Sequence, residues 1–456
     1  MSILDAGQFV PVATGGLGHP GSTLAHSMVW FRDALYLGAS APAARGPEDL
    51  GRIHRLDPAT GAWDEVFAAP VQALDEDAQA RAVWLGGGGI LRQRQPAEAM
   101  GRAFGICAMT VFQGASDAAH CLYAGTMSLW GGQVLRSEDG ISFAPVMAPG
   151  NGDDSVMSIR GLTAFGGRLF ALPSGTITAE GLDRERAPQA IVLVSDDPAG
   201  GVWTEACLPG FGDPANRGVV SLCAAQGHLY AGTSSPARGF QLWRTKAEGA
   251  APYVWERVLT DGAFRYTHNL STAAMAEFGG DLFIGTRIPG FGYDADSDVG
   301  PAACEMIRQR PDGRWDLIFG EPRFTPDGLK VPLSAMGPGL GDPYNSAIWS
   351  MAVQDGALYI GTQSWEPNDI AMNGGGAPLR GGFQLWASTD GEAWVPVLVD
   401  GNGSVTSTGV RALLASPVGL FLGTVNHSRL LQTQALLHGG GADLAEVSAG
   451  FDVWLA

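Results

Sequence analysis

One short pattern recurs along this chain of 456 residues and constrains its fold more than any other feature. The pattern is an aromatic residue between aliphatic or small residues, followed in six of the copies by glycine. A longer stretch around it, GLGDPYNSAIWSMAVQDGALYIGT at 339–362, returns as GFGDPANRGVVSLCAAQGHLYAGT at 210–233. Such self-similarity is the signature of a repeat protein. The copies are ALYLGAS (34–40), CLYAGTM (121–127), RLFALPS (168–174), HLYAGTS (228–234), DLFIGTR (281–287), ALYIGTQ (357–363) and GLFLGTV (419–425).

Each copy has the features of a β-strand within a series of hairpins. An apolar segment such as IWSMAV precedes it across a turn containing Gly or Asp, and two more strand-like segments follow, as in GGFQLWASTDGEAWVPVLVDG at 381–401. Short apolar runs bounded by Gly, Pro, Asp and Asn are typical of strands. The 66 glycines, about twice the usual frequency, fit many tight turns. Consecutive four-stranded antiparallel units are typical of a β-propeller.

The repeat therefore predicts an all-β fold, a single seven-bladed β-propeller over residues 1–456 with four antiparallel strands in each blade. The segment QFVPVATGG at 8–16 resembles an outermost strand, so the N-terminal strand should complete the last blade and close the ring, with SRLLQTQ (428–434) as that blade's third strand. Such a blade leaves no exposed inner edge. The expected blades are 24–70, 105–147, 157–207, 218–260, 270–320, 346–400 and 409–435 plus 7–13, with an insertion at 71–104.

Two short turns carry a family resemblance. SEDGISF (137–143) and STDGEAW (388–394) are similar to the Asp-box turns of sialidase-like propellers, although each is one residue short of that motif. The whole repeat resembles a class of poorly characterised bacterial propellers built on GxGD…LYxGT…GxQLWR(S/T)xDGxxW. This resemblance covers nearly the entire chain. It implies the propeller fold and says almost nothing about activity, because one fold hosts many functions.

Charge and composition exclude several classes of function. The net charge is −18 and no cluster of Lys and Arg is present, which argues against a nucleic acid or an anionic membrane as partner. No apolar run approaches the ~18 residues of a membrane span. The N-terminus lacks the basic and apolar parts of a secretory signal, and five cysteines without regular spacing make no disulfide framework. We expect a cytoplasmic monomer with a small-molecule ligand.

Candidate ligand-binding residues come from aligning the copies on their shared glycine. In a propeller the first strand of each blade lines the axis, and here the longest loops lie on the face where these strands begin, which favours a binding site there. Arginines at apolar strand starts need a carboxylate or an anionic ligand, and rim histidines could move protons or hold a transition metal. The catalytic candidates are His26, Arg160, His268 and Arg411; the substrate-binding candidates are Asn216, Arg217, Asn269, Arg287, Tyr344, Asn345, Trp349, Trp365 and His427.

Each of these candidates also has a structural explanation. The asparagines could bind backbone groups of their own turns. The arginines could pair with Asp153, Asp213 or an acid in a loop, and the aromatic residues could serve packing alone. One acidic loop has a separate interpretation, because Asp294, Asp296, Asp298 and Glu305 match positions 1, 3, 5 and 12 of a calcium loop. Its glycine comes one position late and no helices flank it, so a solvated acidic loop is the alternative.

The sequence thus favours an enzyme that acts on a small anionic or polar-aromatic molecule in an axial funnel, with bacterial specialised metabolism as one setting. The reaction class stays open, since no established catalytic motif is present. GLGHPG at 16–21 matches a dinucleotide fingerprint only in spacing, because a strand rather than a helix is expected after it. A non-catalytic binding module and a calcium-stabilised scaffold are the alternatives. The sequence identifies no definite cofactor, and Ca²⁺ or a transition metal in the funnel are the two metal hypotheses.

Overall fold

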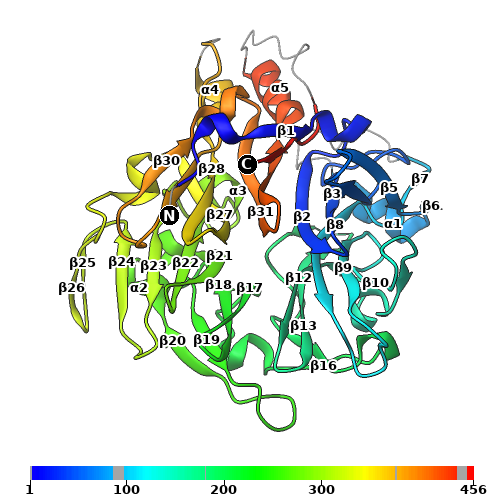
Figure 1. Ribbon diagram of the computed structural model, residues 1–456, viewed down its shortest axis with the longest axis horizontal. Helices are drawn as coiled ribbons and strands as arrows, with labels where there is room; N and C mark the ends of the chain where they lie inside the picture. The colour runs from blue at the N-terminus through cyan, green and yellow to red at the C-terminus, as the bar shows by residue number, and fades with distance from the viewer. Residues whose placement is uncertain (1–2, 86–96, 180, 375–376, 439–448) are drawn as a thin grey trace. The chain divides into compact units, whose positions relative to one another are not determined.

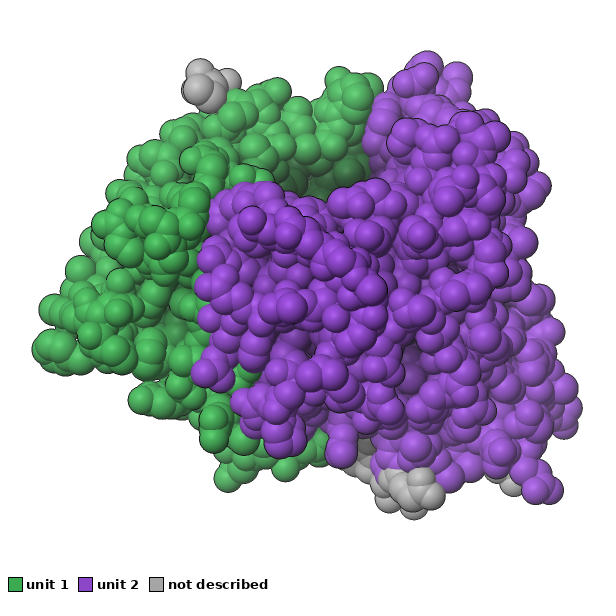
Figure 2. Space-filling view, turned by 90° about the horizontal axis from the view of Figure 1, so that it is seen from below, with its two compact units in different colours: residues 1–23, 235–242, 258–456 green, residues 24–234, 243–257 purple. Residues whose placement is uncertain are grey.

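The chain folds into antiparallel β-sheet that is assembled from consecutive hairpins (Figure 1). The computed structural model describes residues 3–85, 97–179, 181–374, 377–438 and 449–456. Part of the expected insertion at 71–104 therefore lies outside the described residues. Two compact units are present, coloured separately in Figure 2. The first comprises residues 1–23, 235–242 and 258–456, and the second comprises residues 24–234 and 243–257.

The second unit contains four-stranded antiparallel meanders in which each strand pairs with the next along the chain. A further strand, β14 (Leu182–Asp183), pairs with the end of the second strand of the third meander. The meanders are β2 (Leu24–Phe31), β3 (Ala34–Ser40), β4 (Arg52–Asp57) and β5 (Ala62–Ala68); β8 (Gly105–Phe112), β9 (Cys121–Met127), β10 (Val134–Ser137) and β11 (Ala144–Pro145); and β12 (Val156–Phe165), β13 (Arg168–Ile177), β15 (Leu193–Ser195) and β16 (Thr204–Glu205).

Shorter elements complete the description of this part of the chain. β17 (Gly218–Ala225) pairs with β18 (His228–Ser234), and β19 (Leu242–Thr245) pairs with β20 (Glu256–Leu259). Within the expected insertion, β6 (Val71–Ala73) pairs with β7 (Ala99–Gly101), and α1 spans Glu76–Ala82. The first part of the chain is thus almost entirely antiparallel β-structure.

The first unit repeats the same arrangement. Its meanders are β21 (Ser271–Phe278), β22 (Asp281–Arg287), β23 (Met306–Gln309) and β24 (Trp315–Phe319); β27 (Asn345–Gln354), β28 (Ala357–Ser364), β29 (Leu385–Ser388) and β30 (Val395–Leu398); and β31 (Ser407–Ser416), β32 (Gly419–Asn426), β33 (Val453–Leu455) and β1 (Val10–Ala13). β25 (Arg323–Thr325) and β26 (Gly328–Lys330) form a separate hairpin (Figure 1).

The N-terminal strand joins the last meander, but one expected strand is a helix. β1 pairs with β33, and β33 pairs with β32. The segment 428–434, expected as the third strand, instead lies in helix α5 (Ser428–Leu437). Leu431 and Ala435 pack against Ala371 of α4 (Glu366–Asn373), so the buried apolar residues of α5 serve a helix interface. The third strand comes from β33, whose three residues gave too short a pattern to detect.

Close contact between successive meanders explains the recurring glycine. A Cβ atom added at Gly361 would lie 2.4 Å from the Cβ atom of Val410 in the next meander, and one added at Gly285 would lie 2.5 Å from the Cβ atom of Ile348. At Gly125 the added atom would lie 2.3 Å from the carbonyl oxygen of Ile159. These distances exclude any side chain. The glycine is therefore a packing requirement between neighbouring sheets.

The aromatic residue of each copy anchors the core. All of these side chains are among the largest fully buried ones: Tyr36, Tyr123, Phe170, Tyr230, Phe283, Tyr359 and Phe421. Two of them support the turns that resemble Asp-boxes, since a Cβ atom at Gly140 would lie 2.0 Å from the hydroxyl of Tyr36, and one at Gly391 would lie 2.4 Å from the ring of Phe283. Aromatic ring and glycine turn thus form one contact that recurs between meanders.

The turns at 137–143 and 388–394 share one hydrogen-bond pattern. The Ser137 hydroxyl accepts from the Gly140 amide, and the Asp139 carboxylate accepts from two following amides. Ser388 and Asp390 do the same. These amide bonds lower the pKa of both aspartates.

The helices that the structure describes are all too short or too polar to span a membrane.

Candidate functional site

The asparagines that recur before the inner strands hold the turns. The Nδ2 atoms of Asn216, Asn269 and Asn345 donate to the carbonyl oxygens of Gly210, Gly262 and Gly339, each at 2.9 Å. The Asp213 and Asp342 carboxylates accept from the amides two residues later. The repeated residues of this stretch are thus engaged with their own turns, and ligand binding by the asparagines remains a prediction.

Three arginines of the second unit lie around a short acidic segment, and together they form what we call the arginine cluster: Arg160, Arg184 and Arg217 with Asp183 and Glu185. Arg160, on β12, donates to Glu185 at 2.8 Å, and its side chain is 18% exposed. Arg217, just before β17, lies 3.6 Å from the Asp183 carboxylate. The expected alternative of pairing with a loop acid is therefore realised for Arg160, with Glu185 as partner.

Arg184 differs from the other two because no carboxylate pairs with it among the described residues. Its guanidinium donates to the carbonyl oxygen of Pro42 at 3.2 Å and lies 3.9 Å from the sulfur of Met127. The side chain remains exposed, yet the protein around it partly desolvates the guanidinium and lowers its pKa, and the neighbouring Arg160 charge acts in the same direction. Because the cluster contains three arginines and two carboxylates, its net charge is positive.

His26 belongs to the same region. Its Nδ1 atom lies 2.8 Å from the Ser40 hydroxyl, which also accepts from the Ile106 amide. Ser40 is two residues from Pro42, whose carbonyl binds Arg184. A Ser–His pair is the geometry of an activated nucleophile, but Ser40 is 0% exposed. Its hydroxyl therefore positions the imidazole and does not reach a substrate.

His427 is the centre of a second group, in the first unit. Its Nδ1 atom lies 2.5 Å from the Thr408 hydroxyl, and its ring lies edge-on to Phe291 with 4.8 Å between centroids. Burial lowers the pKa of this imidazole to about 4. The Nε2 atom bonds to no residue that the structure describes. His427 is thus a neutral imidazole at ordinary pH, held by one nitrogen while the other remains available.

Aromatic side chains surround the start of β27 and the end of β28. Tyr344 and Trp365 meet edge-on at 4.8 Å, and the Tyr344 hydroxyl donates to Asp369 on α4. Trp349 lies flat against Gly409, where an added Cβ would come within 2.6 Å of the indole. The Arg411 guanidinium stands 5.3 Å from the Trp349 ring. The structure therefore brings Trp349 together with Arg411, and Tyr344 together with Trp365.

His268 and Arg287 are two further candidates of the first unit. His268 is exposed within the short helix η6 (Tyr266–Asn269). Arg287 ends β22, where its backbone pairs with Ser271 and Ala347, and it is 7% exposed.

Acidic residues of the calcium hypothesis bond to other side chains in this structure. Glu305 is 0% exposed, and its carboxylate accepts from Arg323 on both oxygens and from Asn269. The Asp298 carboxylate accepts from Tyr293 instead. In the described part of the chain, no three His, Cys, Asp or Glu side chains gather as a metal site. Arg323 and Asn269 thus engage Glu305, and calcium binding by Asp294, Asp296, Asp298 and Glu305 stays a prediction.

Sequence reasoning missed the segment around Arg184 and the residues Thr408, Phe291 and Asp369. The run DRER at 183–186 was a usable signal, since only 16% of the chain is charged. Thr408, Phe291 and Asp369 carry no comparable signal. They contact His427 or Tyr344 only through the tertiary fold.

Comparisons with known proteins identify no family. No family model and no curated protein matches the chain. Among solved structures, the GH74 xyloglucanase from Xanthomonas campestris shows 16% identity and a TM-score of 0.47 over 92% of this chain and 53% of its own. This chain therefore spans about half the length of the xyloglucanase. U3-55K shows 11% identity and a TM-score of 0.48 over the whole of both chains. Sequence identities and TM-scores this low carry no information about the activity of this chain.

Proposed function

We propose that the protein binds a small anionic molecule at the arginine cluster. One observation carries this proposal: Arg184 is an exposed residue whose guanidinium no described carboxylate neutralises, and it lies next to a second arginine. A cation that is partly desolvated and near a like charge is stabilised when an anion binds. Arg160 and Arg217 are already oriented by Glu185 and Asp183, so the site is preorganised around the unpaired group.

The geometry favours a carboxylate or phosphate as the bound group. A guanidinium offers donors in a planar fork that matches either group. The net charge of −18 opposes the approach of anions in general, so binding should depend on this local cluster rather than on long-range attraction.

The test is a thermal-shift and calorimetric titration with inorganic phosphate, citrate and benzoate at low ionic strength. We expect at least one of them to stabilise the wild-type protein and Arg184→Gln to lose that effect. Arg238→Gln is the matched control, because Arg238 is exposed and forms no ion pair with any residue that the structure describes. Equal stabilisation of Arg184→Gln and the wild type, or none of either by any anion, would refute the proposal.

A second candidate function, enzymatic proton transfer, is favoured by His427. A neutral imidazole whose Nδ1 is anchored can accept a proton at Nε2, and the ring of Phe291 beside it suits an aromatic substrate. Its reactivity can be measured without knowing the substrate, by carbethoxylation with diethyl pyrocarbonate. An ordinary histidine of pKa about 6.5 loses most of its reactivity at pH 5.5. His427 should react equally fast at pH 5.5 and 7.5, and that pH-independent phase should be missing in His427→Gln.

We further propose that the meanders are the blades of a seven-bladed β-propeller with Asp-box-like turns, of the bacterial repeat type. The shared strand order, the recurring glycine contacts and the pairing of β1 with β33 support this arrangement. A crystal structure tests it directly. A different number of four-stranded sheets around the axis would refute it.

A further inference from the structure

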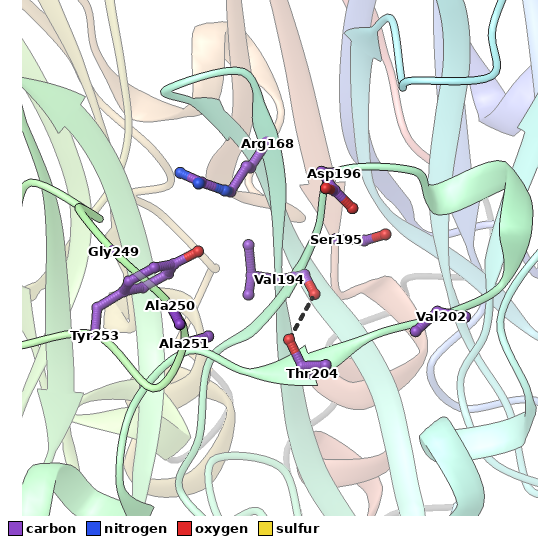
Figure 3. Close-up of a pocket in the computed structure, with 10 residues that line it drawn as sticks. All are labelled: Arg168, Val194, Ser195, Asp196, Val202, Thr204, Gly249, Ala250, Ala251 and Tyr253. Carbon is purple, nitrogen blue, oxygen red and sulfur yellow. Dashed lines mark hydrogen bonds between the residues drawn. The ribbon is translucent and has the colours of Figure 1, made fainter.

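A small cavity lies in the second unit, at the end of β13 opposite to the arginine cluster. Its volume is about 220 Å³, which is below the roughly 300–1,000 Å³ of pockets for drug-sized ligands. The first residue of β13, the end of β15 and the loop before Tyr253 form its walls (Figure 3). The size therefore suits a metabolite of a few heavy atoms.

One side of the cavity carries two hydrogen-bond donors. The Arg168 guanidinium stands 5.6 Å from the Tyr253 ring and donates one bond, of 3.1 Å, to the carbonyl oxygen of Ala247. This anchoring leaves the other guanidinium donors available. The Tyr253 ring is buried against Phe170, and its hydroxyl bonds to no described residue. Figure 3 shows the guanidinium and this hydroxyl on the same side, where they could bind a carboxylate.

The other side carries a negative charge. Asp196 lines the cavity across from Arg168 (Figure 3). Its carboxylate is exposed, and within the described residues it accepts no hydrogen bond and forms no ion pair. Arg168 and Asp196 thus face one cavity without neutralising each other. Such an arrangement complements a molecule that carries both charges.

The floor between the two charges is apolar. Val194, which lies below Arg168 and Asp196 in the view of Figure 3, lines the cavity together with Ala250 and Ala251. The Thr204 hydroxyl donates to the Val194 carbonyl oxygen at 3.5 Å, so it is oriented toward the protein backbone. An aliphatic body would therefore contact this floor while its charged ends remain near the two side chains.

We propose that this cavity binds a small zwitterion, with the carboxylate at Arg168 and Tyr253, the ammonium group at Asp196 and an aliphatic body over Val194. Free amino acids and dipeptides share this chemistry and differ in the spacing of their charges. The site is separate from the arginine cluster, which we propose for anions.

The proposal is tested by calorimetry and saturation-transfer NMR with three zwitterions of different length: L-leucine, 6-aminohexanoate and L-alanyl-L-leucine. Isovalerate and isoamylamine serve as probes with one charge each. We expect one zwitterion to bind at least about tenfold more tightly than either single-charge probe, because each charge-assisted bond contributes separately. If the protein binds isovalerate as tightly as the best zwitterion, the zwitterion assignment is wrong. If it binds none of the three zwitterions, the proposed site is wrong.

Variants locate the binding. Asp196→Asn and Tyr253→Phe keep the size of each side chain and should weaken the preferred zwitterion by about tenfold and about threefold. Arg168→Gln should abolish binding, and circular dichroism checks that it folds. Asp327→Asn is the control, since Asp327 is an exposed acid outside the cavity. Wild-type affinity in both Asp196→Asn and Tyr253→Phe would refute the proposal, whether or not Arg168→Gln folds.

Discussion

Gly361→Ala should destabilise the protein through a single steric contact between two meanders. The added Cβ atom would lie 2.4 Å from Val410 Cβ, 2.7 Å from Val410 Cγ1 and 2.8 Å from Ser350 Oγ. The backbone of Gly361 is not in the left-handed region, so alanine itself is conformationally allowed and only the crowding acts. Overpacking of this kind costs about 1–3 kcal/mol, which raises the unfolding equilibrium constant roughly five- to 150-fold.

Gly337→Ala provides the matched control. No atom lies within 4 Å of the Cβ position at Gly337, and its φ of −71° suits alanine. Restriction of the unfolded chain should therefore stabilise that variant by about 0.4–1 kcal/mol. Urea denaturation followed by tryptophan fluorescence compares the two variants with the wild type. If Gly361→Ala unfolds at the same urea concentration as Gly337→Ala, the glycine is not a packing requirement and our explanation of the repeat fails.

Three further predictions follow from buried charges and from the chain ends. Asp117 accepts from Tyr123 and Arg136, and these bonds outweigh burial to lower its pKa. Asp117→Asn should therefore cost about 3–5 kcal/mol, and the wild type should lose this contribution as pH falls below about 4; equal urea midpoints at pH 7 would contradict it. His427 titrates at about pH 4 when folded and at about 6.5 when unfolded. Its neutral form is favoured in the folded state, so stability should fall by up to about 3 kcal/mol between pH 6.5 and 4, and His427→Gln should fall less in melts across that range. Deletion of residues 1–13 removes the partner of β33 and should lower Tm and promote association in size-exclusion chromatography through the freed edge; an unchanged Tm and elution volume would refute this.

The strand pattern could be predicted because each copy of the repeat meets the same neighbours. Gly361 lies against Val410 as Gly285 lies against Ile348. Because the same close approach recurs, only glycine fits at both positions. The helix at 428–437 was not predictable in this way. SRLLQTQ has an apolar pair that fits a strand or a helix equally well, and its contact with α4 decides between them.

The candidate site was predicted only in part, for a related reason. Aligning the repeats selected Arg160, which lies within β12, and Arg217 and His427 were added from the same rim, but the sequence could not supply the partners of these residues. Glu185 lies in a connection between strands β14 and β15, and Thr408 corresponds to Ser346 in the preceding copy, so neither partner has a residue type that the repeat predicts. Whether an arginine is neutralised or available depends on those partners, and so the alignment left both interpretations open.

Function in this chain is therefore best sought where the repeat is interrupted. Residues at equivalent positions, such as Asn216 and Asn345, bind their own turns, because a turn that recurs needs the same support each time. The uncompensated charge of Arg184 lies in a segment between the second and third strands of its meander. Asp196 and Tyr253 lie in connections of irregular length as well. A group that is costly to the fold and absent from the other copies is not explained by the repeat, and the ligand sites proposed above give a physical reason to retain it.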